Sequence, residues 1–186
     1  MSAAFPAQAI TARDFDEVVR KHQRRVYRVL MFLLRDPDEA DSLTQECFLR
    51  AYQNLEQFRG ESSFETWLLR IAVNLARDHG RNRRVAFWKR LFGLSDERVS
   101  AQVMTVAAPG PTPEQTSVAR AEVKAVWKAV EGLSQQQRTI FALRFVEEME
   151  LHEIAEVLEL KVGSVKAQLF RAVHEVRDTL REQQWR

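Results

Sequence analysis

The fold is decided most clearly by residues 151–180, LHEIAEVLELKVGSVKAQLFRAVHEVRDTL. Apolar residues recur at steps of three and four over residues 151–158, which predicts a short helix. A tight connection at residues 160–164 leads to a longer helix that buries Val165. Ala155 is a small residue at the position where the two helices must approach each other. A short helix, a tight turn and a longer helix form a helix-turn-helix arrangement.

The outward face of the longer helix carries residue types that suit a DNA groove. Its members are Ser164, Lys166, Ala167, Phe170, Arg171 and His174. Lysine and arginine reach phosphates or guanine edges, and an outward aromatic ring can contact a thymine methyl group. The alternative is that the two helices simply pack at a corner, with a solvated outer face.

Composition and periodicity extend the helical prediction to the whole chain. The chain has 186 residues, is 45% hydrophobic, and contains only six glycines and five prolines, which favours helices over an all-β fold. Helical periodicity begins at Phe15, breaks at Asp36-Pro37-Asp38, and breaks again at residues 58–61. Ser62 and Glu65 are spaced as a capping box that starts the next helix. The aromatic and basic stretch at 85–94 is expected to continue that helix or pack on it.

A change of composition divides the chain in two. Residues 95–117 contain three of the five prolines and show no hydrophobic period, which is typical of a linker. We therefore predict an all-α chain with small helical domains at 1–94 and 118–186, joined by a flexible linker at 95–117. The second domain contains another capping-box start, at Ser134 and Gln137.

A second basic segment lies in the first domain. Between Arg77 and Arg90 there are six basic residues and one acid, Asp78. Asn74, Arg77 and Arg81 share one face of the predicted helix, and aromatic residues lie beside it: Phe58, Phe64 and Trp67. Aromatic rings next to a basic groove suit single-stranded DNA, because rings stack on bases while cations hold the backbone. The alternatives are a solvated helix end and, for Phe64 and Trp67, a place in the core.

The predicted helix after Pro37 is acidic at its start and apolar beside it. The acidic and amide residues are Asp38, Glu39, Asp41, Gln45 and Glu46, and they lie beside Leu43 and Phe48. A surface that is both acidic and apolar can dock a protein partner. A solvated helix start would look the same.

Catalytic patterns are not found in the sequence. The histidines His22, His79, His152 and His174 are scattered, and none pairs with Cys47 or a carboxylate at metal-ligand spacing. We therefore expect no metal, no cofactor and no enzyme activity. A single cysteine, with neither a signal peptide nor a membrane-spanning stretch, predicts a cytoplasmic protein without membrane insertion.

Three segments, in this order, resemble the extracytoplasmic-function (ECF) RNA polymerase sigma factors of the sigma-70 superfamily. Residues 38–52 resemble the helix that binds core polymerase, residues 58–74 the segment that reads the −10 promoter element, and residues 162–172 the helix that reads the −35 element. The resemblance covers residues 15–84 and 118–181. It implies a region 2 helical bundle followed by a region 4 helix-turn-helix domain.

The resemblance also implies partners and site residues. Core polymerase would bind Asp38, Glu39, Asp41, Leu43, Gln45, Glu46 and Phe48. The −10 element would bind Phe58, Arg59, Ser62, Phe64, Asn74, Arg77, Asp78, Arg81 and Arg84. The −35 element would bind Ser164, Lys166, Gln168, Phe170, Arg171 and His174. The expected partners are core RNA polymerase, promoter DNA and an anti-sigma factor, in an extracytoplasmic or stress response. Residues 85–94 are not part of the family pattern, and our hypothesis is that they extend the surface that contacts the polymerase or the anti-sigma factor. The alternative is a stand-alone helix-turn-helix regulator.

Overall fold

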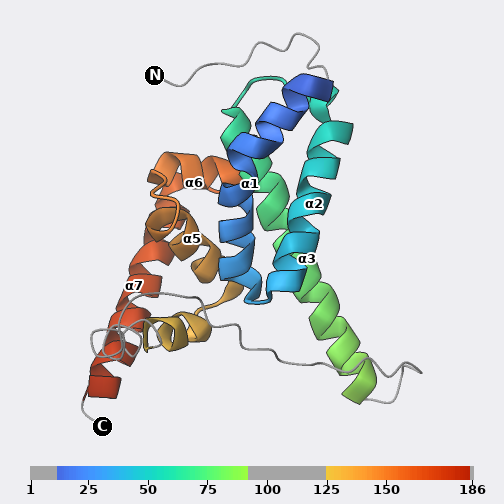
Figure 1. Ribbon diagram of the computed structural model, residues 1–186. Helices are drawn as coiled ribbons and strands as arrows, with labels where there is room; N and C mark the ends of the chain where they lie inside the picture. Colours follow the sequence, from blue (N-terminus) through green and yellow to red (C-terminus); the bar gives the residue numbers. More distant parts are fainter. Residues whose placement is uncertain (1–11, 92–124, 185–186) are drawn as a thin grey trace, which may run out of the picture.

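The computed structural model describes residues 12–91 and 125–184, and places side chains for residues 15–82 and 125–182. All regular structure within these ranges is helical, as the sequence predicts. The elements in Figure 1 are α1 (Ala12–Leu34), α2 (Pro37–Gln53), the 3-10 helix η1 (Leu55–Gln57), α3 (Phe64–Leu91), a helical stretch at 125–132, α5 (Gln135–Phe145), α6 (Leu151–Leu158) and α7 (Val162–Gln184). The predicted linker at 95–117 lies outside the described residues, so the domain boundaries stay a prediction.

Helices α1, α2 and α3 form an N-terminal bundle around one apolar core (Figure 1). Val26, Leu30 and Leu68 are almost fully buried there, and Cys47 lies among them. Full burial of a valine or leucine side chain stabilises a fold by about 1.5–3 kcal/mol. The core is therefore sufficient to hold the three helices in register. Helix α3 runs to Leu91, which confirms that residues 85–91 continue it, whereas 92–94 lie outside the described residues.

The connection between α1 and α2 lies at the predicted break, Asp36-Pro37-Asp38. Asp36 is the N-cap of α2, and its carboxylate accepts hydrogen bonds from the backbone N–H groups of Asp38 at 3.1 Å and Glu39 at 3.2 Å. Pro37 occupies the first turn, where its missing N–H costs nothing. Arg35 has a φ of 59°, so the chain reverses within two residues.

The start of α3 differs from the prediction. Ser63, not Ser62, caps the helix, because its Oγ accepts the backbone N–H of Thr66 at 3.0 Å. Glu65 does not close a capping box there. Its carboxylate instead accepts a hydrogen bond from Arg25 on α1 at 2.7 Å, which is an interaction that the local spacing could not predict.

Helices α5, α6 and α7 form the C-terminal unit. The predicted capping box at its start is confirmed: Gln137 N–H donates to Ser134 Oγ at 3.3 Å, and Ser134 N–H donates to Gln137 Oε1 at 3.0 Å. The short helix at 151–158 is also confirmed. Helix α7 begins at Val162, so the turn is shorter than predicted. Glu159, in the left-handed conformation with a φ of 55°, makes that sharp turn possible.

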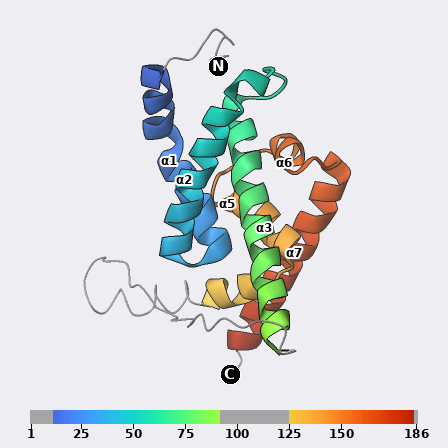
Figure 2. The ribbon, with the colours of Figure 1, turned by 90° about the vertical axis from the view of Figure 1, so that its right-hand side faces the viewer.

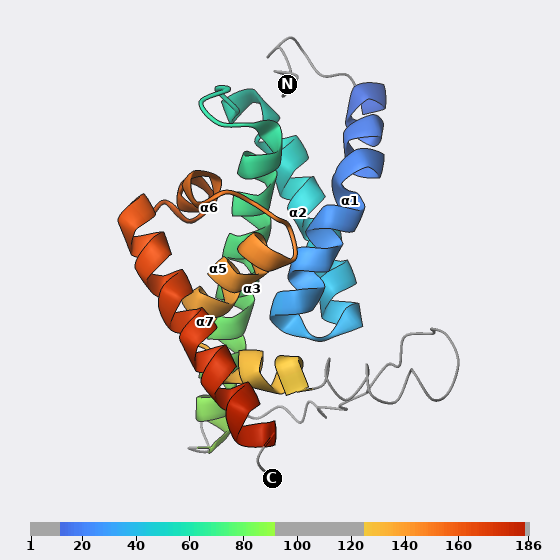
Figure 3. The same ribbon diagram turned by 90° about the vertical axis from the view of Figure 1, so that its left-hand side faces the viewer.

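The C-terminal unit packs directly on the N-terminal bundle, with α5 against α1 and α6 against α3 (Figures 2 and 3). One apolar cluster crosses the boundary. It contains Val29, Leu69 and Val73 from the bundle, and Ile140, Leu143, Met149 and Ile154 from the C-terminal unit. Most of these side chains are fully buried. The two predicted domains therefore form one closed body in this structure.

Candidate nucleic-acid interface

The outer face of α7 presents a row of accessible side chains. Ser164, Lys166, Arg171 and His174 are exposed, Gln168 is half-buried, and Phe170 is 71% exposed. Val165 and Ala172, on the opposite face, are fully buried. The helical period therefore separates a packing face from an outward face, as the sequence predicts. An exposed phenylalanine between cationic residues is suited to a groove that offers both phosphates and base methyl groups.

The loop before α3 is lined by three aromatic rings that pack on each other. Ring centroids are 5.5 Å apart for Phe58 and Phe64, 5.3 Å for Phe58 and Trp67, and 5.4 Å for Phe64 and Trp67. Phe64 is buried in the bundle core, so the structure corrects its predicted place on a DNA-binding surface. Its role here is to support Phe58. Gly60 has a φ of 72° at the loop tip, with open space around it.

The exposed polar stripe of α3 leads away from that loop. Arg59 in the loop is exposed and Ser62 is half-buried. On α3, Arg77 and Arg81 are exposed, Asn74 and Asp78 are half-buried, and Arg81 lies 3.5 Å from Asp78. The side chain of Arg84 lies outside the described residues. A cationic stripe on a long helix can follow a nucleic-acid backbone.

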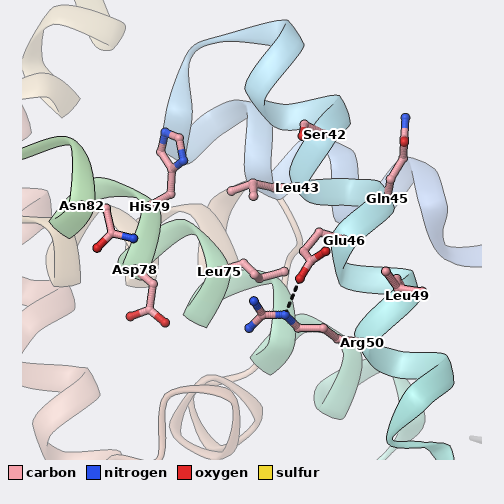
Figure 4. A pocket seen from close by; sticks show the side chains of 10 residues that line it. All are labelled: Ser42, Leu43, Gln45, Glu46, Leu49, Arg50, Leu75, Asp78, His79 and Asn82. Carbon is pink, nitrogen blue, oxygen red and sulfur yellow. Dashed lines mark hydrogen bonds and ion pairs between the residues drawn. The ribbon is translucent and has the colours of Figure 1, made fainter. Parts of the chain in front are cut away.

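A groove of about 650 Å³ lies between α2 and α3 (Figure 4). Its lining residues are Ser42, Leu43, Gln45, Glu46, Leu49, Arg50, Leu75, Asp78, His79 and Asn82. Figure 4 shows the α2 and α3 side chains on its two sides, with Glu46 paired to Arg50 at 2.7 Å. The groove is both apolar and charged, which suits a protein partner better than a small molecule.

Most of the predicted α2 surface residues are accessible. Asp38, Asp41 and Gln45 are exposed, and Glu39, Leu43 and Glu46 are half-buried. Phe48 is a correction, since it is only 7% exposed and packs edge-on against Phe15 in the core. The sequence interpretation missed Leu49, which is 52% exposed in the same groove. A signal was present, because Leu49 lies off the buried stripe of its helix.

The titratable groups of the bundle give no reactive centre. Burial raises the pKa of the Cys47 thiol to about 12, so the thiol stays protonated near neutral pH. Burial also lowers the pKa of His22, against an opposing effect of Glu65, whose carboxylate lies 3.7 Å from His22 Nδ1. Among the described residues, no group of His, Cys, Asp and Glu side chains could hold a metal ion.

Comparison with known proteins matches both units of this structure. Residues 18–85 match the protein family Sigma-70 region 2, and residues 124–175 match Sigma-70 region 4. The chain is 30% identical over 172 residues to the ECF RNA polymerase sigma factor SigW of Bacillus subtilis, covering 90% of this chain and 89% of the relative. The chain belongs to the ECF family of RNA polymerase sigma factors. This sigma factor is also 32% identical over 173 residues to the RNA polymerase sigma-H factor of Pseudomonas aeruginosa, covering 86% of this chain and 82% of that relative.

Solved structures share the fold of this sigma factor. The sigma factor RpoE from Bartonella quintana, solved with the anti-sigma factor NepR, gives a TM-score of 0.69 at 20% identity, over 91% of this chain and 98% of the other. CnrH, solved with the cytosolic domain of CnrY, gives 0.65 at 22% identity, over 92% and 90%. None of the described helices of this sigma factor is long and apolar enough to cross a membrane.

Proposed function

We propose that this sigma factor binds core RNA polymerase and directs transcription from promoters that it recognises at a −10 and a −35 element. The observation that carries the proposal is the outer face of α7, where Phe170 and Arg171 are exposed on the second helix of a helix-turn-helix unit. Family membership supports the polymerase as the partner that does the chemistry. The sigma factor itself then needs neither a metal nor a cofactor, and we expect it to act in the cytoplasm without catalysing a reaction.

The groove between α2 and α3 is the proposed polymerase surface. Its contacts would come from Asp38, Glu39, Asp41, Leu43, Gln45 and Glu46, to which we add Leu49. Phe48 would hold the helix in place from inside the bundle. Acidic side chains around an exposed leucine favour a partner surface that is basic and apolar.

The loop at residues 58–64 and the stripe on α3 are the proposed −10 site. Phe64, buried in the core, would support the ring of Phe58 by packing against it. The residues of the site itself would be Phe58, Arg59, Ser62, Asn74, Arg77, Asp78, Arg81 and Arg84. Extruding a base from the stack costs roughly a few kcal/mol. The cations of the stripe would offset that cost through contacts to phosphates. The −35 contacts would come from Ser164, Lys166, Gln168, Phe170, Arg171 and His174.

An anti-sigma factor is a further proposed partner, in an extracytoplasmic or stress response. One similar structure is a sigma factor bound to an anti-sigma factor, and the other is CnrH bound to the cytosolic domain of CnrY. The proposed domains are 1–94 for region 2 and 118–186 for region 4, with 95–117 as the linker. The family matches, at residues 18–85 and 124–175, each fall within one of these proposed domains.

Run-off transcription from a fragmented genomic library, with purified chain and sigma-free core polymerase, tests the proposal. We expect defined start sites that are lost with Arg171→Ala and with Asn74→Ala. Arg20→Ala and Gln53→Ala are matched controls, because both residues are exposed and lie outside the proposed sites. A side chain that contacts a base edge favours the correct base over a wrong one by about 1–3 kcal/mol, so loss of one such contact should weaken promoter recognition measurably.

The same experiment separates the sigma factor from the stand-alone regulator. A chain that fails to bind core polymerase but still binds duplex DNA would replace the proposal with the regulator. Transcripts that persist at full yield in Arg171→Ala would remove the −35 assignment.

A further inference from the structure

Helix α7 carries an acidic side chain on the outward face where the proposed DNA contacts lie. Phe170, His174 and Asp178 follow one another at steps of four residues, so they form a row along the helix. The side chains of His174 and Asp178 are 62% and 49% exposed. A carboxylate on a face that meets DNA repels the phosphates. The row gives Asp178 a role that can offset this cost.

The imidazole ring of His174 is held by the carboxylate of Asp178. His174 Nδ1 lies 2.7 Å from Asp178 Oδ2, which is a hydrogen-bond distance. An ionised carboxylate can only accept a hydrogen bond, so Nδ1 must carry a proton. The contact therefore fixes both the orientation of the ring and the nitrogen that is protonated, and it leaves Nε2 outside the pair.

The ring of His174 in turn lies beside the ring of Phe170. Their centroids are 6.2 Å apart, and the ring planes are tilted by 54°. This separation is within the range in which aromatic rings attract each other. Because most of the Phe170 ring is exposed, a neighbour on the same helix is well placed to restrict its rotation. His174 is such a neighbour.

The backbone that carries the row is anchored from the other side of α7. Val165, Ala172 and Val176 are buried in apolar clusters that include residues of α5. The hydroxyl of Thr179, next to Asp178, donates to the carbonyl of Glu175 at 2.9 Å, within the same helix. A contact built on a packed helix keeps its geometry better than one built on a loop.

A charged pair at a spacing of four residues can also serve only to stabilise a helix. Glu46 and Arg50 on α2 form a pair with this spacing, at 2.7 Å. The pair on α7 differs in two respects. One of its members contacts an exposed aromatic ring, and the pair lies on the face opposite to the buried residues. Both differences connect it to the proposed DNA contacts.

We propose that Asp178 is a positioning residue of the −35 site, which holds His174 through Nδ1 so that His174 keeps the exposed ring of Phe170 directed into the DNA groove. Asp178 acts through these two side chains and makes no base contact of its own. The part of the inference that concerns DNA rests on the proposed function. The contact between Asp178 and His174 in the free chain does not.

The ring nitrogens of His174 test this contact in the free, full-length chain. Nitrogen NMR spectra at about pH 8.5, where an ordinary imidazole is neutral, distinguish a proton on Nδ1 from a proton on Nε2. His174→Gln identifies the signals of His174 among those of the four histidines. We expect the proton on Nδ1 in the parent and a mixture of both tautomers in Asp178→Ala. The same mixture in the parent would overturn the proposal.

Promoter binding by the holoenzyme, which is core polymerase with this sigma factor, tests the effect on −35 recognition. The half-saturating holoenzyme concentration is measured at fixed salt on one promoter found by run-off transcription. Asp178→Ala should raise it by about threefold, the size expected for an exposed pair of side chains. Charge alone predicts the opposite sign, because the variant removes a negative charge from a DNA-binding face.

Glu182→Ala is the matched control for that loss of charge. Glu182 is an exposed acid one helical turn beyond Asp178 on α7, and its residue four positions earlier is not a histidine. We expect this variant to leave the half-saturating concentration unchanged or to lower it, and to leave the tautomer of His174 as in the parent. Weakened binding of equal size in Glu182→Ala and Asp178→Ala would overturn the proposal.

Two further variants separate positioning from a general structural effect. In the His174→Ala chain Asp178 has no ring to hold, so adding Asp178→Ala should no longer weaken binding. Asp178→Asn keeps an oxygen that can accept the Nδ1 proton, so it should bind DNA at least as tightly as the parent. An Asp178→Ala effect of equal size with and without His174 would overturn the proposal, and so would tighter binding by Asp178→Ala alone.

Failure of the proposed function gives a different result from failure of this inference. A holoenzyme that binds no promoter with any of these chains would overturn the proposed function, and the role of Asp178 in DNA recognition would fall with it. The tautomer of His174 in the free chain would still decide whether Asp178 holds the ring.

Discussion

Cys47 shows how burial removes the chemistry of a residue. Its thiol lies in the region 2 core, 3.6 Å from the carbonyl oxygen of Leu68, and the pKa is raised from 9.0 to about 12. A difference of 3 units leaves about a thousandfold less thiolate at neutral pH. We expect Cys47 to react with a thiol reagent much more slowly in the folded chain than in denaturant, because the thiol is both buried and protonated. The rate is measured by the thiolate that the reagent releases. Equal rates in both conditions would show that the core opens readily.

His22 couples the stability of region 2 to pH. Its pKa lies below the usual 6.5 because burial disfavours the charged ring. The unfolded chain therefore binds this proton more readily than the folded chain. The stabilisation is complete above about pH 6.5, and it is lost as the pH falls below that value towards the folded-state pKa.

Urea unfolding at pH 7.5 and pH 5.5 measures that effect. We expect the parent to lose more stability over this interval than His22→Gln does, since the substitution removes the group that takes up the proton. His152→Gln, at an exposed position on α6, should behave as the parent. A loss of equal size in parent and His22→Gln would assign the pH dependence to other groups.

At the scale of elements, the N-cap of α2 is a local interaction that a single substitution can test. Asp36 satisfies the N–H groups of Asp38 and Glu39 at the start of α2. Asp36→Ala should lower the free energy of unfolding by about 1 kcal/mol, whereas Asp36→Asn should nearly retain it. Denaturant titration measures both. Helix α2 forms one wall of the proposed polymerase groove. If Asp36→Asn lowers the free energy of unfolding as much as Asp36→Ala does, the negative charge of Asp36, and not its capping hydrogen bonds, stabilises the start of α2.

Helix α1 shows what hydrophobic periodicity cannot predict. The stripe through Val26 and Leu30 is buried in the core of region 2. Val29 and Phe32 are buried as well, but against region 4, so they form a second apolar stripe on the same helix. Periodicity identifies apolar positions without naming the surface that covers them.

At the scale of the whole molecule, the shared apolar cluster should make the two domains unfold together. We expect far-UV circular dichroism and tryptophan fluorescence to give coincident urea transitions, with Trp67 in region 2 and Trp127 in region 4. Phe32 contacts Trp127 at 4.8 Å and Phe141 at 6.4 Å, between ring centroids.

Phe32→Ala should therefore separate the two transitions. Truncation of a buried phenylalanine costs about 3–5 kcal/mol, and here much of that loss falls on the contact between domains. Phe145→Ala, at an exposed ring of region 4, is the control that should leave the transitions coincident. If Phe32→Ala unfolds in one coincident transition, the apolar boundary does not couple the domains.

Local chemistry accounts for what could be predicted. The break at Asp36-Pro37-Asp38, the capping box at Ser134, the short helix at 151–158 and the outward Phe170 each depend on residues within one or two helical turns. The α2 surface was predicted well except for Phe48. That residue lies next to Cys47 on the buried side of its helix, so the signal for its burial was already present.

The sequence by itself therefore determined the helices, their order, the helix-turn-helix unit and the family resemblance, because each is encoded by neighbours along the chain. Only the tertiary structure decided that region 4 closes onto α1 and that Glu65 binds Arg25 instead of capping α3. It alone placed Glu147 between Arg25 and Arg28. The physical reason is distance along the chain: Glu147 lies 122 and 119 residues from its partners, and no local period reports a charge pair formed across such a separation.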